Sequence, residues 1–183
     1  GRVPPKSGRV TCNGKNLTLI STTESVAAGI LMLPGDRKRE ALMPVLGVRV
    51  NSTIQSLKRF SLAGLLRRGT ERKAVTGLVT ELEIRTPSLE QPVEFLSGGN
   101  AQKVSVSRTF LREPAVILAY EPTQGVDVGS RFDIYQALRK RTDAGAAMIV
   151  KSSECPWMAW LSRSGRIRHK VPACSDWRRP LTV

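Results

Sequence analysis

A serine and two adjacent glycines open the part of this sequence that is best suited to binding an anion. The segment reads LSGGNAQK over residues 96–103 and leads into an apolar run of helical spacing. The first turn of a helix leaves backbone N–H groups without intrahelical partners, and the helix dipole adds positive potential at the same point. Glycine has no Cβ to obstruct a ligand that approaches these amides. The pattern therefore predicts a phosphate site where this helix begins.

A carboxylate follows about one helix later in the chain. Residues 116–120 read VILAY, which is typical of a short buried strand, and Glu121 comes directly after it. Open parallel sheets bind their ligands at the carboxyl ends of the strands. Glu121 is therefore placed where a sheet of this kind performs its chemistry.

Together these segments resemble the signature motif and the Walker B region of ATP-binding-cassette (ABC) ATPases. The asparagine after the glycines, followed by QK at 102–103 and EPTQGVDVG at 121–129, is similar to the second cassette of tandem sugar-import ATPases of the ribose and xylose type. The run DRKRE at 36–40 belongs to the same resemblance. The matches extend over residues 7–156, and five separate blocks occur in the family's order.

The resemblance implies a role for each residue of the signature segment. In ABC proteins two cassettes meet head to tail, and the signature motif of one closes over ATP held by the other. Asp127 occupies the D-loop position at the same interface, although a helix N-cap before Gly129 explains it equally well from local sequence. The positions implied to contact nucleotide are Ser97, Gly98, Gly99, Asn100, Gln102 and Asp127.

The catalytic positions depart from the family pattern. Glu121 stands at the position of the catalytic glutamate, but Tyr120 replaces the Walker B aspartate that helps to hold Mg²⁺. Gly35 stands where these second cassettes usually carry a glutamate, and Ser153 stands at the position of the switch histidine. No metal ligand is predicted in this chain, because a neutral phenol does not replace a carboxylate around Mg²⁺.

The family's phosphate-binding loop is not matched. Gly1 and Lys6-Ser7 fit that motif only with a register one residue short, and Pro5 lacks the N–H that a glycine supplies there. We expect the chain to begin just after this loop, and we expect no ATP hydrolysis by the isolated chain.

The resemblance implies an α/β fold, namely an incomplete P-loop NTPase ABC ATPase fold. Its sheet is mostly parallel, with an N-terminal antiparallel hairpin at Asn13-Gly14 and a helical signature subdomain over roughly residues 42–112. We expect residues 1–156 to form this partial nucleotide-binding domain. We expect residues 157–183 to be a basic tail rich in Trp and Arg, diverged or disordered, and a reading-frame change near Cys155 is one hypothesis for it.

Local patterns predict the individual elements. The segment 70–82 has apolar residues at helical spacing with Glu71 outside, and Ser21 with Glu24 forms a capping box. Arg37, Lys38 and Arg39 are interpreted as a solvated face. Further helices are expected at 22–28, after Asn100 as far as Pro114, and at 128–142, and strands at 30–33, 116–120 and 147–150.

The implied function is that of an ATP-binding subunit, or a fragment of one, in an ABC-type sugar importer that couples ATP hydrolysis to carbohydrate transport. Its cofactors are ATP and Mg²⁺, both bound through a partner cassette. Its partners are that second cassette, membrane permease subunits and, indirectly, a periplasmic sugar-binding protein. The implied location is cytoplasmic, peripheral on the inner face of the plasma membrane.

Composition leaves two other interpretations open. The chain has 183 residues, 40% of them hydrophobic, which suits one domain with a core, and its net charge is +14. That charge and the Trp- and Arg-rich tail favour a basic nucleic-acid-binding module, although the charges are scattered and the tryptophans do not alternate regularly with them. A degenerate relic that folds poorly is the other interpretation. Three cysteines without CxxC spacing and one histidine predict no zinc site.

Overall fold

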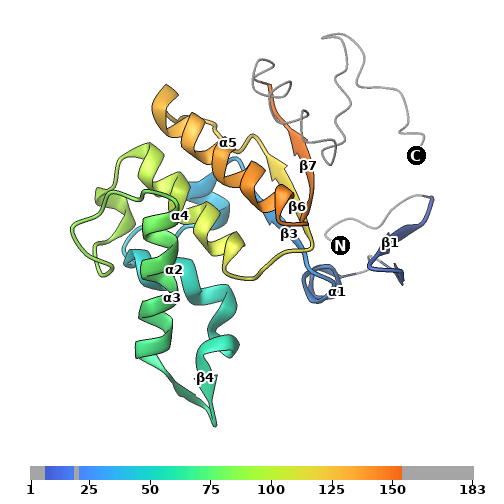
Figure 1. Cartoon of the computed structure of the whole chain (residues 1–183), viewed down its shortest axis with the longest axis horizontal. Helices are drawn as coiled ribbons and strands as arrows, with labels where there is room; N and C mark the ends of the chain where they lie inside the picture. Colours follow the sequence, from blue (N-terminus) through green and yellow to red (C-terminus); the bar gives the residue numbers. More distant parts are fainter. Residues whose placement is uncertain (1–6, 19–20, 154–183) are drawn as a thin grey trace.

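A three-stranded parallel sheet forms the centre of the molecule (Figure 1). The computed structural model describes residues 7–18 and 21–153. The strands are β3 (Ile30–Leu33), β6 (Val116–Tyr120) and β7 (Ala147–Lys151), in the order β3-β6-β7. Ile30 pairs with Val116, and Val116 pairs with Ala147. The strands expected from the sequence are confirmed, and their carboxyl ends share one edge.

The N-terminal hairpin forms as its turn residues predict. Strands β1 (Val10–Cys12) and β2 (Lys15–Leu17) pair antiparallel around Asn13 and Gly14, which both have positive φ. Two positive φ values in a two-residue loop match the twist of a hairpin. Helix α1 (Thr22–Ala27) follows, with Ser21 as its N-cap. The Ser21 Oγ accepts from the Glu24 amide at 3.1 Å, which is the serine half of the expected capping box, and the Glu24 carboxylate accepts from Thr18.

Most helices gather on one side of the sheet (Figure 1). Helix α5 (Val128–Asp143) connects β6 to β7, and Gly145, with φ +113°, follows its end as expected. The small hairpin β4–β5 projects from this group. The other elements there are η1 (Arg37–Ala41), α2 (Val48–Thr53), η2 (Ile54–Phe60), β4 (Ser61–Leu62), β5 (Leu65–Leu66), α3 (Arg68–Glu81), η3 (Val93–Phe95) and α4 (Gly98–Phe110).

The core lies between this helical group and one face of the sheet. Alternate strand residues are buried there, and they meet apolar side chains of α4 and α5. Tyr135 and Phe110 are the largest fully buried side chains. The strand residues that face the core are Leu31, Leu33, Ile117, Ala119, Met148 and Val150. The predicted class, a mostly parallel sheet with an antiparallel hairpin and a helical part, is confirmed.

One expectation for α3 is wrong. Glu71 was expected on the solvent side, but its side chain is 1% exposed and accepts from Arg49 Nη1 at 2.7 Å and from Thr53 Oγ1 at 2.7 Å. Arg49 also contacts Glu90, and this contact lowers the pKa of the Glu90 carboxyl. A charge is buried here because partners from α2 satisfy it.

The tail from Pro156 onward lies outside the described residues, so the expectations for residues 157–183 and for Cys155 stay predictions, as does the domain division. Within the described ranges, none of the helices combines the length and apolar character needed to cross a membrane.

Candidate functional site

Helix α4 begins at the serine and glycines singled out in the sequence. Ser97 is its N-cap, and the Ser97 Oγ accepts from the Asn100 amide at 3.3 Å and from Asn100 Nδ2 at 3.0 Å. Asn100 Oδ1 in turn accepts from the Arg85 amide at 2.8 Å. The Asn100 side chain therefore ties the cap to the preceding loop and has little freedom to turn toward a ligand.

Two amides at this helix start are not used by the fold. No acceptor in residues 7–18 or 21–153 receives a hydrogen bond from the amide of Gly98 or Gly99, and the first intrahelical donor is Ala101, which bonds to the Ser97 carbonyl at 2.9 Å. Ser97 itself is exposed. Gly98 is half-buried and Gly99 is buried. The helix start therefore combines an exposed hydroxyl with unpaired N–H groups and positive potential, and Ser97 is its exposed part.

Gly99 is the point of closest approach between α4 and α5. A Cβ on Gly99 would lie 2.1 Å from Ser130 Oγ and 2.9 Å from Asp127 Oδ2. A Cβ on Gly98 would lie 3.1 Å from the Gly125 carbonyl oxygen. Both glycines are thus needed for packing within this chain, in addition to any ligand.

Asp127 is the N-cap of α5. Its Oδ1 accepts from the Ser130 amide at 3.0 Å, and this hydrogen bond, with the Ser130 side chain, lowers the pKa of the Asp127 carboxyl. The local interpretation of Asp127 as a cap is therefore confirmed. The same carboxylate lies beside Gly99, on the surface next to the α4 start.

Arg37 joins the loop after β3 to the loop after β6. Its guanidinium donates to the carbonyl oxygens of Gln124 at 2.8 Å and Gly125 at 3.3 Å, and burial lowers its pKa. The expected solvated face is therefore wrong for Arg37, while Lys38 and Arg39 are exposed as expected. Sequence analysis missed this contact because its acceptors are backbone carbonyls 87 and 88 residues away.

Gln102 lies behind the site. Its side chain is 0% exposed, and Nε2 donates to the Pro122 carbonyl at 2.7 Å. It holds the loop that follows Glu121, so in this arrangement its contact with the site is indirect.

Glu121 stands at the carboxyl end of β6, as predicted, with φ +44°. Left-handed backbone is uncommon for a non-glycine residue, and the Glu121 amide is fixed by the Lys151 carbonyl at 2.7 Å. The carboxylate accepts from the Ser153 amide at 2.9 Å and from the hydroxyls of Ser153 and Ser152 at 3.1 and 3.4 Å. The segment after β7 thus holds the carboxylate.

The neighbouring groups do not suit Mg²⁺. Tyr120 offers a phenol, and Lys151 places its ammonium 4.4 Å from the centre of the Tyr120 ring and donates to the phenol oxygen at 3.3 Å. Mg²⁺ requires anionic or neutral oxygen donors in octahedral geometry, and an ammonium opposes it. Tyr120, which stands at the Walker B aspartate position, therefore contacts an ammonium where Mg²⁺ would require a carboxylate.

Close packing at this edge of the sheet explains why residue 35 is a glycine. A Cβ there would lie 3.0 Å from Gln124 Oε1 and 3.1 Å from both Glu121 Cβ and the Tyr120 carbonyl oxygen. The loop after β3 approaches β6 too closely for a larger residue to fit without local movement.

The sequence of this chain is similar to a known protein family and to individual proteins of that family. A family model described as "ABC transporter" matches residues 1–124. The xylose import ATP-binding protein XylG of Photobacterium profundum is 36% identical over 164 residues, which cover 90% of this chain and 32% of that protein. The ribose import ATP-binding protein RbsA of Chromobacterium violaceum is 37% identical over 164 residues, covering 90% and 33%. The chain spans about a third of the length of these curated relatives.

Solved structures share the fold. The dimeric structure of the bacterial cassette MJ0796 has a TM-score of 0.70 and 20% identity, over 87% of this chain and 68% of that chain. A structure of cbiO1 from Clostridium perfringens, part of the ABC transporter complex cbiONQ, has a TM-score of 0.68 and 19% identity, over 88% and 62%. At this identity the likeness concerns the fold alone, and it agrees with the incomplete ABC ATPase fold predicted.

Proposed function

Because this chain belongs to the ABC transporter family, we propose that it forms the second, C-terminal cassette of a ribose- or xylose-type import ATPase and that its α4 start contacts ATP held by another cassette. The single observation that carries this proposal is the pair of unpaired amides at Gly98 and Gly99 beside the exposed Ser97 hydroxyl. A phosphate satisfies such amides without any loop of the chain's own.

The contacts of each site residue suggest a separate role for it in this proposal. Ser97 and Gly98 contact the terminal phosphate, since Ser97 is exposed and Gly98 is half-buried, and the unpaired amide of the buried Gly99 adds to the positive potential behind them. Asn100 orients Ser97 through its 3.0 Å contact, and Gln102 supports the Pro122 loop through its 2.7 Å contact. Asp127 lines the same surface next to Gly99.

Glu121 has no magnesium-dependent step in this proposal, because the Tyr120 and Lys151 pair does not suit the ion. The nucleotide and its Mg²⁺ belong to the partner cassette. In this chain the Glu121 carboxylate accepts hydrogen bonds from Ser152 and Ser153 and so fixes the segment after β7 next to the end of β6. Hydrolysis and sugar transport are then properties of the assembly.

A groove beside the site supports the proposed contact with a permease. Its volume is about 330 Å³, and Arg37, Leu42, Val93 and Leu96 contribute to its lining. Phe95 is exposed next to it. We propose that the permease docks here, so that movement of the Arg37 loop reaches both the groove and the α4 start. Replacement Phe95→Ser should weaken co-purification with the permease and leave the unfolding midpoint unchanged, whereas full retention of the permease would contradict this docking site.

A stimulation assay tests the phosphate-binding role. A cassette with an intact phosphate loop, taken from a ribose-type importer, is mixed with the full chain, and the ATP hydrolysis of the mixture is measured. We expect stimulation that Ser97→Arg abolishes by filling the surface, while Ser97→Thr, which keeps the hydroxyl, retains it. Stimulation that persists in Ser97→Arg would contradict the proposal.

A further inference from the structure

The hairpin β4–β5 ends in two exposed leucines. The side chain of Leu62 is 66% exposed and that of Leu65 is 76% exposed, and Ala63 and Gly64 turn between them with positive φ. The hairpin projects from the helical group in Figure 1. Single exposed leucines are ordinary, but two at the tip of one projection form a continuous apolar tip.

Exposed basic residues flank the two strands of this hairpin in the chain. Residues 41–70 contain no Asp or Glu. Arg59 pairs with Glu113 at 2.6 Å, whereas Lys58 and Arg67 form no ion pair within the part of the chain that the structure describes. The exposed basic residues next to the two strands, here called the collar, are Lys58, Arg59, Arg67 and Arg68.

A hollow lies beside the collar. Its volume is about 720 Å³, and Lys58, Arg59 and Arg112 line it together with Leu57 and Glu113. Three cationic side chains and one carboxylate leave it a net positive lining. The hollow thus offers an anionic group a place next to the apolar tip.

We propose that the hairpin inserts Leu62 and Leu65 into the surface of an anionic lipid bilayer while the collar contacts lipid phosphates. A bilayer interface supplies what both parts require, since an apolar layer lies directly beneath anionic headgroups. A nucleic acid supplies the phosphates but no apolar layer for the leucines. The strands have two residues each, which is too short for stable pairing with a strand of a protein partner. This proposal does not rest on the proposed function.

Sedimentation with vesicles tests the proposal on the full chain. Vesicles of equimolar phosphatidylcholine and phosphatidylglycerol are compared with vesicles of phosphatidylcholine alone. We expect binding to the anionic vesicles that the double substitution Leu62→Ser, Leu65→Ser weakens about tenfold or more, since each buried apolar side chain contributes to partitioning. Removing two collar charges with Lys58→Gln and Arg67→Gln should weaken it by about fivefold per charge.

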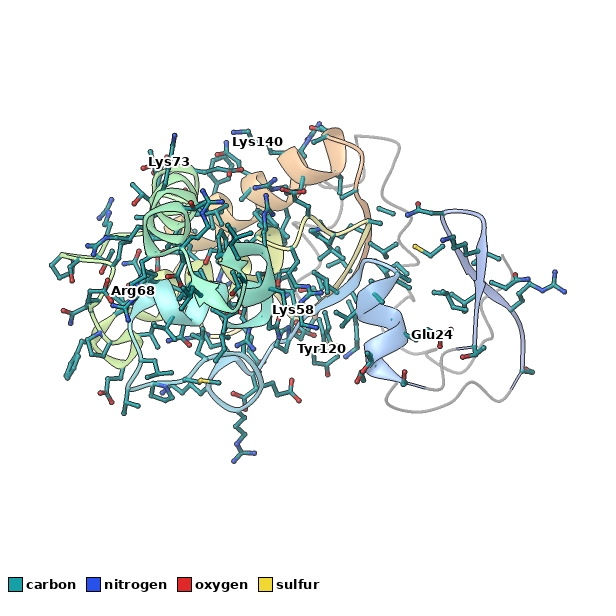
Figure 2. The ribbon with its side chains drawn as sticks, turned by 90° about the horizontal axis from the view of Figure 1, so that it is seen from below. Glu24, Lys58, Arg68, Lys73, Tyr120 and Lys140 are labelled. Atoms are coloured by element: carbon teal, nitrogen blue, oxygen red, sulfur yellow. The ribbon has the colours of Figure 1, made fainter. Side chains whose placement is uncertain are left out.

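Two control variants match these changes in chemistry but not in place. Val45→Ser with Val128→Ser alters two side chains that are each 70% exposed. Lys15→Gln with Lys140→Gln removes two exposed charges that lie outside the β4–β5 hairpin. In Figure 2, Lys58 and Arg68 lie over the helical group, and Lys140 lies away from them at the upper edge of the view. All other basic residues, including those after residue 153, stay in every variant. A loss of vesicle binding that is confined to the β4–β5 variants is therefore caused by the β4–β5 hairpin and its collar.

Several results would overturn the proposal. Equal binding by the leucine variant and the unchanged chain would mean that charge alone attracts the chain. A leucine-dependent self-association without lipid would make a second copy the occupant of the tip. Tight binding of duplex DNA that the collar variant weakens and the leucine variant leaves unchanged, without binding to anionic vesicles, would make a nucleic acid the partner of this surface. Unfolding midpoints of all variants exclude misfolding as the cause.

Discussion

Gly99 is the residue at which the two helices of the site meet. Its missing side chain lets α4 approach Ser130 and Asp127 of the α5 start, and this contact buries Gly99. The sequence motif alone attributes this glycine to ligand binding. The structure adds a packing requirement that holds whether or not a ligand is present.

This packing requirement predicts a specific rescue. Gly99→Ala should lower the free energy of unfolding by about 2 kcal/mol, because its Cβ would overlap the Ser130 side chain. Adding Ser130→Gly removes the 2.1 Å and 2.6 Å overlaps and should restore part of that loss. Urea denaturation of the single and double variants measures it. Independent, additive losses in the double variant would mean that Gly99 and Ser130 do not oppose each other.

Asp127 predicts a pH dependence. Its pKa is lowered by the hydrogen bonds from Ser130, so its ionised form stabilises the folded chain above the pKa of the unfolded state. That contribution is lost as the pH falls through the lowered value in the folded chain. The difference in melting temperature between the unchanged chain and Asp127→Ala should therefore be present near neutral pH and shrink below about pH 4. A difference that grows toward acid pH would have the wrong sign. Asp127→Asn, which keeps a capping group, should lie between the two.

At the scale of elements, Lys103 and Asp133 join α4 to α5. The Lys103 ammonium is 2.7 Å from Asp133 Oδ2 and donates to the Glu83 carbonyl at 3.1 Å, and its side chain is 5% exposed, against 37% for Asp133. Water can therefore solvate the aspartate if its partner is removed, but it reaches the lysine poorly.

This difference in exposure predicts that removing either partner lowers the free energy of unfolding by a different amount. Asp133→Asn leaves a buried ammonium without its counter-charge and should cost about 3 kcal/mol, whereas Lys103→Met leaves a carboxylate that water reaches and should cost about 1 kcal/mol. Chemical denaturation measures both. A larger loss for Lys103→Met would show that the aspartate is the member that depends on its partner.

The elements show which sequence signals suffice. The α4 start, β6 and α5 follow from caps, apolar spacing and Gly145, which are local signals, and all three were predicted. Glu71 was placed outside because the helical period alone assigns it there, and its partner Arg49 lies 22 residues upstream. The π-helix over residues 37–41 was not predicted; Asp36 caps it by accepting from the Arg39 amide, and Arg37 adds long-range contacts with Gln124 and Gly125. Long-range polar partners leave no periodic trace in a sequence.

At the scale of the whole molecule, two surfaces carry separate proposals. The α4 start is proposed to face a partner cassette, and the β4–β5 hairpin is proposed to face lipid. The motif at residues 96–103 indicated the first surface, because it is a recognisable order of residues. No motif indicated the second. The net charge of +14 was interpreted either as a sign of nucleic-acid binding or as a scattered excess. Lys58 and Arg67 are exposed and flank the β4–β5 hairpin in the chain.

The whole chain is also predicted to lack ATP turnover of its own. Tyr120 and Lys151 do not suit Mg²⁺, and the Glu121 carboxylate is engaged by the segment after β7. Phosphate release by the purified chain should stay at background with ATP and Mg²⁺. A turnover that both chelation and Glu121→Gln abolish would contradict this, while one that neither abolishes would indicate a contaminating enzyme.

The most direct measurement for the account is sedimentation of the chain with a cassette that has an intact phosphate loop but a slowed hydrolysis step. We expect a heterodimer with ATP, much less heterodimer with ADP or without nucleotide, and loss of the ATP-dependent part in Ser97→Arg. A heterodimer that forms equally without nucleotide, or that Ser97→Arg leaves intact, would contradict the claim that the α4 start binds the terminal phosphate.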